Sequence, residues 1–308
     1  MSTETGVELS SVSYRYGKVE AVRDLTLSIA PGEMFGLIGP DGAGKTTTIR
    51  TICGLLPATS GTVRVFGLDP VRQHRQLTAV VGYLSQRFSL YTDLSVDENI
   101  AFFAEIHGVE RFEPIRDRLL ELTQMTPFRK RLAGQLSGGM KQKLALACTL
   151  VHSPRLIVLD EPTTGVDPVA RREFWKLLGE FLSQGITIVM STPYLDEAER
   201  CSRVALLNEG RLLALDAPRA LRATLPGQLF EVMAGDHRRA VRALEQVSGV
   251  DGVQLFGERI HVRVRQGDAG AESRIAARLK ESSIEASTRL VAPSLEDVFV
   301  TMLGEARS

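Results

Sequence analysis

The stretch Met34-Phe-Gly-Leu-Ile-Gly-Pro-Asp-Gly-Ala-Gly-Lys-Thr46 decides the fold. Its apolar start predicts a strand at Met34–Ile38, and the residues that follow predict a helix over Lys45–Leu55. In the loop between them, glycines allow successive backbone N–H groups to point inward at an anion, and the helix N-terminus adds a favourable dipole. A strand, a glycine-rich loop and a helix in this order predict a phosphate-binding loop.

Two side chains of this loop have specific expected roles in nucleotide and metal binding. Lys45 is expected to reach the β- and γ-phosphates of a nucleotide, and the Thr46 hydroxyl is expected to bind Mg²⁺. The alternative is a chance match in a glycine-rich turn, which the flanking strand and helix disfavour. An anionic Asp41 could repel phosphates or cap the loop, and no functional conclusion is drawn from it. The nucleotide is expected to contact Gly39, Pro40, Asp41, Gly42, Ala43, Gly44, Lys45, Thr46 and Thr47.

A second acidic motif follows the apolar run Leu156–Leu159, which predicts a fully buried strand. A carboxylate at the end of such a strand is costly unless it is compensated. A Mg²⁺ ion explains Asp160. The side chain of the adjacent Glu161 points in a different direction and suits a general base for an attacking water. The alternative is an acidic strand end that caps the next turn.

The segment Ser137-Gly138-Gly139 opens a predicted helix at 138–152. A serine hydroxyl, two glycine amides and a helix N-terminus together form a second phosphate site. Because one nucleotide does not need two such sites from one chain, we expect this one to complete the pocket of a second subunit. The alternative is an N-cap serine followed by glycines that serve packing.

Composition narrows the class of protein. The chain has 308 residues, with 37 basic and 37 acidic side chains, and this balance argues against a nucleic-acid binder. The three cysteines have no metal-type spacing, which suits buried thiols in a reducing cytosol. The first residues do not resemble a signal peptide, and no apolar run approaches the roughly 20 residues that span a bilayer. Work at a membrane would therefore require docking to another chain.

Periodicity predicts two domains. Residues 1–225 alternate strands and helices around a parallel core, interrupted by a helical subdomain at about 87–150. Residues 226–308 show the order strand–helix–strand–strand–helix–strand, which predicts a small ferredoxin-like α+β domain, and then a closing amphipathic helix. This second domain has no catalytic constellation. It is expected to support dimerisation, contact a membrane subunit or regulate the first domain.

Taken together, these motifs resemble those of the ATP-binding subunits of ABC transporters over residues 5–220. The resemblance assigns the Walker A loop to 39–46, the signature to Leu136-Ser-Gly-Gly-Met-Lys-Gln142 and Walker B to the strand before Glu161. It implies a P-loop NTPase with a RecA-like core and an antiparallel β subdomain. It also places Gln86 in the Q-loop as a catalytic residue and Mg²⁺ partner, Asp167 in the D-loop, and Tyr16 against adenine. A strand aromatic such as Tyr16 could instead belong to the core.

The resemblance further implies two cassettes that close on two ATP molecules and drive transmembrane permease subunits. The protein is then expected on the cytoplasmic face of the cell membrane. The signature and the C-terminal extension resemble the ABC-2-type exporter branch, which is assigned to drug, antibiotic or polysaccharide export. Phe88 and Tyr91 are expected to contact the permease, unless they are local core residues.

The sequence departs from the family at Pro193. The switch histidine should follow Ser191-Thr192, and proline has no side-chain donor for the γ-phosphate or for Glu161. Proline suits the first turn of a helix, so a helix over 193–200 is expected to form normally. We expect slow hydrolysis in this chain's own site and an asymmetric heterodimer with a competent partner, and an ordinary homodimer remains the alternative. Two other possibilities are a slow regulatory or assembly subunit and a soluble ABC-type ATPase that acts on ribosomes or DNA.

Overall fold

The computed structural model describes residues 5–86 and 90–305, and the chain divides into two compact units. The first unit ends at Ala217 and the second begins at Pro218. The boundary predicted at 225/226 was therefore too late. The reason is helix α8 (Pro218–Ala223), which packs against the closing helix α11 (Leu295–Glu305) and so belongs to the second unit.

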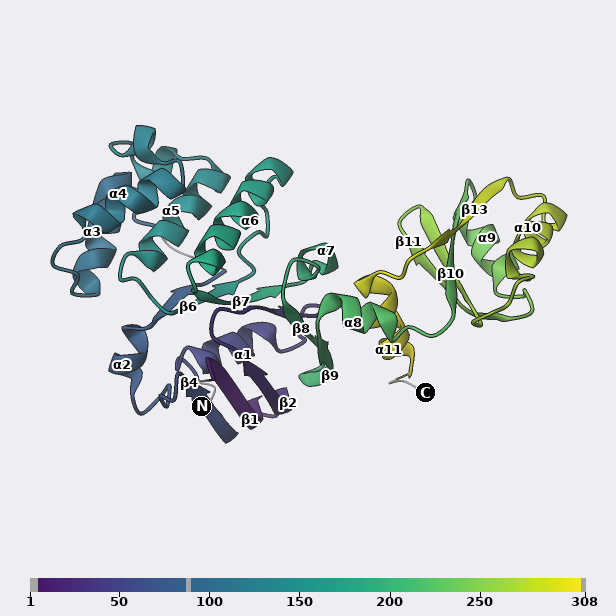
Figure 1. Cartoon of the computed structure of the whole chain (residues 1–308), viewed down its shortest axis with the longest axis horizontal. Helices are drawn as coiled ribbons and strands as arrows, with labels where there is room; N and C mark the ends of the chain where they lie inside the picture. Colours follow the sequence, from purple (N-terminus) through teal and green to yellow (C-terminus); the bar gives the residue numbers. More distant parts are fainter. Residues whose placement is uncertain (1–4, 87–89, 306–308) are drawn as a thin grey trace. The chain divides into compact units, whose positions relative to one another are not determined.

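A six-stranded sheet forms the centre of the first unit, in the order β5-β6-β7-β3-β8-β9 (Figure 1). All neighbours are parallel except β9, which pairs antiparallel with β8 and was not predicted. Strands β3, β6 and β7 are buried throughout. Full burial was predicted for β6 from its uninterrupted apolar run. The strands are β3 (Met34–Ile38), β5 (Val81–Leu84), β6 (Leu156–Asp160), β7 (Thr187–Thr192), β8 (Arg203–Asn208) and β9 (Arg211–Asp216).

A second, antiparallel sheet has the order β2-β1-β4, with β1 (Val7–Tyr16), β2 (Val19–Ile29) and β4 (Ser60–Val65). Helix α1 (Lys45–Ile52) contributes to one hydrophobic core with both sheets. This packing buries Ile49 and Ile52 completely and fixes the direction in which α1 leaves the phosphate loop. The short helix α2 (His74–Thr78), which was not predicted, precedes β5.

Helices cluster between β5 and β6, where the helical subdomain was predicted (Figure 1). Ser95 and Glu98 form a capping box at the start of α3, which defines where this helix begins. Helix α6 (Pro168–Ser183) and the short α7 (Leu195–Ala198) follow β6 and β7. The elements of the cluster are α3 (Val96–Ile106), α4 (Glu113–Leu122), η1 (Thr126–Phe128), η2 (Ala133–Gln135) and α5 (Gly138–Leu150).

The parallel register brings three chain segments to one edge of the central sheet. Ile38 is in register with Thr192, and Asp160 is in register with Ser191. The phosphate loop leaves β3 at the same edge. Ligands of open α/β sheets bind outside the carboxyl ends of the strands, so this edge is where a site is expected.

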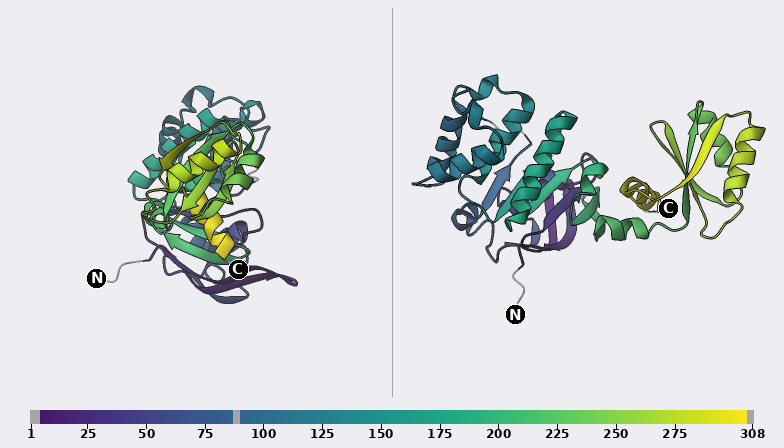
Figure 2. Two further views of the ribbon diagram at one scale, coloured as in Figure 1. Left: turned by 90° about the vertical axis from the view of Figure 1, so that its right-hand side faces the viewer. Right: turned by 45° about the horizontal axis from the view of Figure 1, so that its top comes forward.

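Apart from α8, which was not predicted, the second unit has the element order that the sequence predicts (Figure 2). Its antiparallel sheet has the order β11-β12-β10-β13, and the core lies between this sheet and helices α9 and α10. The elements are β10 (Gln228–Ala234), α9 (His237–Leu244), β11 (Val250–Phe256), β12 (Arg259–Val264), α10 (Ala271–Glu281) and β13 (Ala286–Val291).

A histidine–carboxylate pair joins β12 to α11 in this unit. His261 Nδ1 lies 2.6 Å from Asp297 Oδ1, and Nε2 lies 3.7 Å from Glu231 Oε2. The hydrogen bond with Asp297 raises the pKa of His261, against the opposing effect of burial. The raised pKa means that the folded chain holds this proton more tightly than the unfolded chain does.

This pair predicts a pH-dependent stability of the second unit. Its contribution is complete below the unfolded-state pKa of about 6.5 and is lost as the pH rises through the higher folded-state pKa. We expect the urea midpoint of this unit, followed by circular dichroism, to fall as the pH rises through that window. His261→Gln should flatten the fall, whereas His237→Gln in the same unit should not. Equal pH slopes in all three proteins would contradict this assignment.

Candidate nucleotide site

The phosphate loop has the backbone that its glycines predict. Gly44 has φ +98°, a left-handed conformation, and it directly precedes α1. A Cβ atom at Gly44 would lie 2.5 Å from the carbonyl oxygen of Ala21, so no other residue fits without displacing the backbone. The N-terminus of α1 therefore stays open toward the loop, where it favours an anion.

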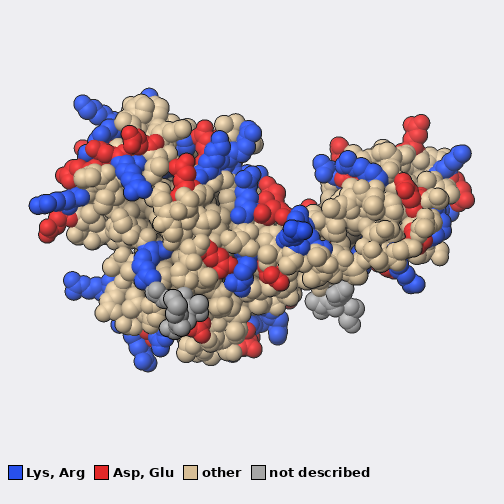
Figure 3. Space-filling view, viewed as in Figure 1, with Lys and Arg blue, Asp and Glu red and all other residues tan. Residues whose placement is uncertain are grey.

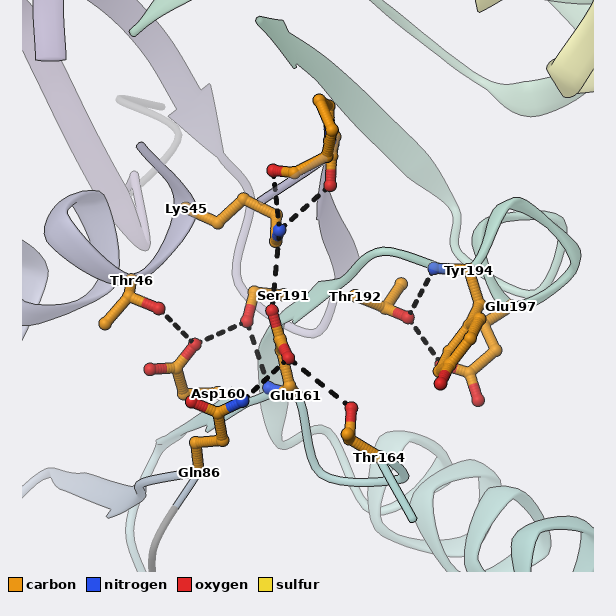
Figure 4. A network of polar contacts seen from close by, with 12 residues as sticks. Lys45, Thr46, Gln86, Asp160, Glu161, Thr164, Ser191, Thr192, Tyr194 and Glu197 are labelled. Carbon is orange, nitrogen blue, oxygen red and sulfur yellow. Dashed lines mark hydrogen bonds and ion pairs between the residues drawn. The ribbon is translucent and has the colours of Figure 1, made fainter. Parts of the chain in front are cut away.

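Lys45 lies at the centre of the loop with only 4% of its surface exposed. Its Nζ donates hydrogen bonds to the carbonyl oxygens of Gly39, at 2.9 Å, and Pro40, at 3.1 Å. The same nitrogen lies 3.4 Å from Glu161 Oε1 (Figure 4). The loop thus holds a buried cation next to the carboxylate that was predicted as general base.

Two hydroxyl groups donate hydrogen bonds to one carboxylate oxygen of Asp160. Thr46 donates to Oδ1 at 3.0 Å and Ser191 donates to the same atom at 2.6 Å. These oxygen donors fit Mg²⁺, which prefers carboxylates and hydroxyls and retains several waters. Sequence reasoning missed Ser191 as a site residue, because only the pairing of β6 with β7 places it opposite Asp160.

Glu161 is held in an unusual conformation at the end of β6. Its φ is +50°, which is costly for a residue other than glycine. Its N–H donates to Ser191 Oγ at 3.0 Å, and Gln86 Nε2 donates to its Oε2 at 2.9 Å. Thr164 Oγ1 also donates to Oε2, at 3.4 Å. Two predicted catalytic residues, Gln86 and Glu161, therefore meet directly.

A cavity of about 660 Å³ opens beside these groups. Gln86, Glu161 and the loop residues from Asp41 to Thr47 line it, together with Arg23 and Glu209, which the sequence analysis did not single out. Tyr16 is not among the lining residues. Its ring is 46% exposed and lies edge-on to Tyr14, with 4.8 Å between the ring centroids.

The Ser137-Gly138-Gly139 segment also lies outside this cavity lining. Ser137 is exposed and caps α5, because its Oγ accepts the N–H of Met140 at 3.3 Å. Asp167 caps α6 in the same way, by accepting the N–H groups of Val169 and Ala170. The second phosphate motif therefore does not line the chain's own cavity.

The two signature glycines differ in their surroundings. A Cβ atom at Gly139 would lie 2.5 Å from the Cβ of Ala170 on α6, whereas one at Gly138 would meet no atom within 4 Å. We expect Gly139→Ala to lower the free energy of unfolding by about 1–3 kcal/mol through overpacking. The matched Gly138→Ala should cost at most about 1 kcal/mol. Urea unfolding followed by the fluorescence of Trp175 measures both, and equal losses would contradict the packing role.

Pro193 is not part of a helix, contrary to the prediction. Helix α7 begins at Leu195, and Tyr194 is its N-cap. The hydroxyl of Thr192 accepts the N–H of Tyr194 at 3.0 Å, so the chain bends at Pro193 before the helix starts. The predicted position of the switch histidine thus lies in a short bend that directly follows β7.

An aromatic pair joins the segment that follows β5 in the sequence to helix α3. Tyr91 is 45% exposed and packs edge-on against Phe102 of α3, with ring centroids 4.4 Å apart. Phe88, the other residue predicted to face a permease, lies outside the described residues. Within the described part of the chain, no helix is long and apolar enough to span a membrane.

Comparisons with known proteins identify similar chains. The family model described as ABC transporter matches residues 22–164. The probable multidrug ABC transporter ATP-binding protein YbhF of Escherichia coli (strain K12) is 43% identical over 93% of this chain and 50% of its own length. The Nod factor export ATP-binding protein I of Rhizobium etli is 34% identical over 97% of this chain and 94% of its own length.

Among solved structures, a dimeric ATP-binding cassette in a post-hydrolysis state, bound to ADP and Pi, is 28% identical. It matches with a TM-score of 0.61 over 68% of this chain and 98% of its own. The chain belongs to the ABC transporter family, as an ATP-binding cassette protein. ATP-binding cassettes are, as a class, ATPases. The chain spans about half the length of the first curated relatives that it matches.

Proposed function

We propose that this chain is the ATP-hydrolysing subunit that powers an ABC-type membrane exporter through separate transmembrane subunits. One observation carries the proposal: Lys45, Thr46, Asp160 and Glu161 converge beside a single cavity at the carboxyl edge of the sheet. The relatives named for multidrug transport and Nod factor export support the export direction.

In this proposal the phosphates of ATP lie on the loop from Gly39 to Thr47, and adenine stacks on Tyr16. Thr46, Gln86 and Asp160 hold Mg²⁺, which supplies charge neutralisation at the phosphates. Lys45 contacts the β- and γ-phosphates. Glu161 accepts a proton from the attacking water, whose oxygen forms the new bond to the γ-phosphorus as the bond to the β-phosphate bridging oxygen breaks.

A second cassette completes each site. We propose that Ser137, Gly138 and Gly139 of this chain close the partner's nucleotide and that Asp167 communicates across the interface. Their separation from the chain's own cavity supports this assignment. The related cassette bound to ADP and Pi is itself a dimer.

We further propose that Pro193 slows hydrolysis in the chain's own site and that the partner is a different, catalytically competent cassette. Proline provides no hydrogen-bond donor at this position, and the loss of one positioned electrostatic group costs roughly 10²–10³ in rate. Pro193 also favours a second candidate, a slow regulatory or assembly subunit. The two candidates differ in whether repairing this position restores rapid turnover.

Docking to a permease would place the chain on the cytoplasmic face of the membrane. We propose that the exposed Tyr91 and the neighbouring helical subdomain form the docking surface.

The surface charge does not favour a nucleic-acid partner. Acidic and basic side chains are interspersed on the viewed face (Figure 3), and the formal net charge of the chain is zero.

ATP binding by the purified chain tests the proposed site. We expect Lys45→Ala to weaken ATP binding by about tenfold to a hundredfold, because a buried charge-assisted contact contributes about 1.5–3 kcal/mol. Isothermal titration with ATP and Mg²⁺ measures this loss. Lys143→Ala, which removes an ion pair with Glu173, serves as the control. Equal affinities of the wild-type chain and Lys45→Ala would exclude this loop as the ATP site.

A further inference from the structure

A buried carboxylate lies next to the site without lining it. Glu197 on α7 is 1% exposed, and both of its oxygens are hydrogen bonded. Thr163 Oγ1 donates to Oε1 at 2.6 Å. Thr192 Oγ1 donates to Oε2 at 2.7 Å (Figure 4). Trp175 Nε1 is 3.5 Å from Oε1, and Arg171 Nε is 3.7 Å from the same atom.

These contacts join two segments that hold Glu161 from opposite sides. Thr163 lies two residues after Glu161, on the segment that leads to Asp167. Thr192 directly follows Ser191, whose hydroxyl accepts the N–H of Glu161 and donates to Asp160. One carboxylate therefore fixes the distance between the segment after β6 and the end of β7.

The backbone of Glu161 depends on such a restraint. Its left-handed φ of +50° persists only where the surroundings over-determine it. The N–H bond to Ser191 restrains one side of the residue, and the Thr163–Glu197 bond restrains the chain on the other side. Pro193 adds no side-chain donor, so the hydroxyl of Thr192 is the group through which Glu197 holds the end of β7.

We propose that Glu197 is a positioning residue for ATP hydrolysis: it holds the segments 161–167 and 191–194 together and so aims the Glu161 carboxylate. This inference rests on the proposed role of Glu161 as general base. Glu197 contacts neither the phosphate loop nor Gln86, so its removal should affect the chemical step and leave nucleotide binding intact. A misplacement of about 1 Å at a reacting group costs up to about 10² in rate.

The test compares Glu197→Ala, Glu197→Gln and a matched control, Glu33→Ala. Glu33 is also a buried carboxylate, which accepts the N–H of Ala30 at 2.8 Å and lies 3.4 Å from Arg203. Single-turnover hydrolysis and ATP affinity are measured in the full chain, in both the wild-type and Pro193→His backgrounds. Hydrogen exchange of residues 161–167 is measured in parallel, because it does not depend on turnover.

In the Pro193→His background, we expect Glu197→Ala to slow hydrolysis by about tenfold to a hundredfold, with an ATP affinity within about twofold of that of the same background. Exchange in 161–167 should become faster than in Glu33→Ala. Glu197→Gln should retain most of the rate, because its amide oxygen still accepts one hydroxyl. A rate loss no larger than that of Glu33→Ala, or unchanged exchange in 161–167 in both Glu197 variants, would overturn the proposal.

Different results would overturn the proposed slow hydrolysis at this site and the proposed positioning role of Glu197. If Pro193→His and the wild-type chain hydrolyse ATP equally, the proposal of a slowed site is wrong, and the comparison of Glu197 with Glu33 still holds. If neither background exceeds Lys45→Ala, hydrolysis by this site is excluded, and the positioning of 161–167 is still decided by hydrogen exchange.

Discussion

Replacing Glu161 with glutamine in the Pro193→His background is expected to lower the rate of ATP hydrolysis by about 10²–10⁴-fold, because a positioned general base contributes that much. Glutamine has nearly the same shape as glutamate but does not accept a proton from water. The carboxylate also lies 3.4 Å from Lys45 Nζ, so its neutralisation removes a competitor for the lysine and should leave ATP binding intact or tighter.

Single-turnover hydrolysis with enzyme in excess measures this effect even where the wild-type rate is low. The Pro193→His background provides a faster reference. Glu173→Gln is the matched control, since Glu173 is paired with Lys143 and lies outside the cavity lining. A Glu161→Gln rate within a few-fold of its background would show that another group accepts the proton.

Local patterns in the sequence predicted the elements that carry the site. The β3 strand was predicted with its observed bounds, and α1 begins at Lys45 as expected, because apolar runs and glycine positions determine both. The adjacent Asp160 and Glu161 were assigned different environments from their positions at the strand end. The structure places one against Thr46 and the other against Lys45 and Gln86.

Contacts between distant segments could not be predicted in the same way. Ser191 becomes part of the site only through the register of β7 with β6, and Glu197 reaches Thr163 across 34 positions of sequence. No local pattern encodes these pairings. The packing of α8 on α11 is likewise a long-range contact, which is why the domain boundary was placed too late.

The predicted helix start at Pro193 was wrong, because a side-chain hydrogen bond competes there with helix formation. Proline was expected to open a helix at position 193, since it suits the first helical turn. In the structure, Thr192 accepts the N–H of Tyr194 and the helix starts at Leu195. A side-chain hydrogen bond of this kind offers the backbone an alternative to the helix.

Introducing histidine at Pro193 is expected to raise ATP turnover by about 10²–10³-fold, the contribution of one positioned electrostatic group. The bend at this position directly follows Thr192, so a residue introduced there lies at the same sheet edge as Ser191. Proline donates no hydrogen bond, whereas histidine does. The stability of the chain should change little, because the helix that follows begins two residues later.

The central claim is that this cassette binds ATP but hydrolyses it slowly. The most direct test is to compare steady-state ATP turnover by the wild-type chain, Pro193→His and Lys45→Ala. We expect a wild-type rate close to the Lys45→Ala background and a Pro193→His rate that is higher by about 10²–10³-fold. A wild-type rate far above the background, with no gain from Pro193→His, would contradict it and identify a self-sufficient cassette.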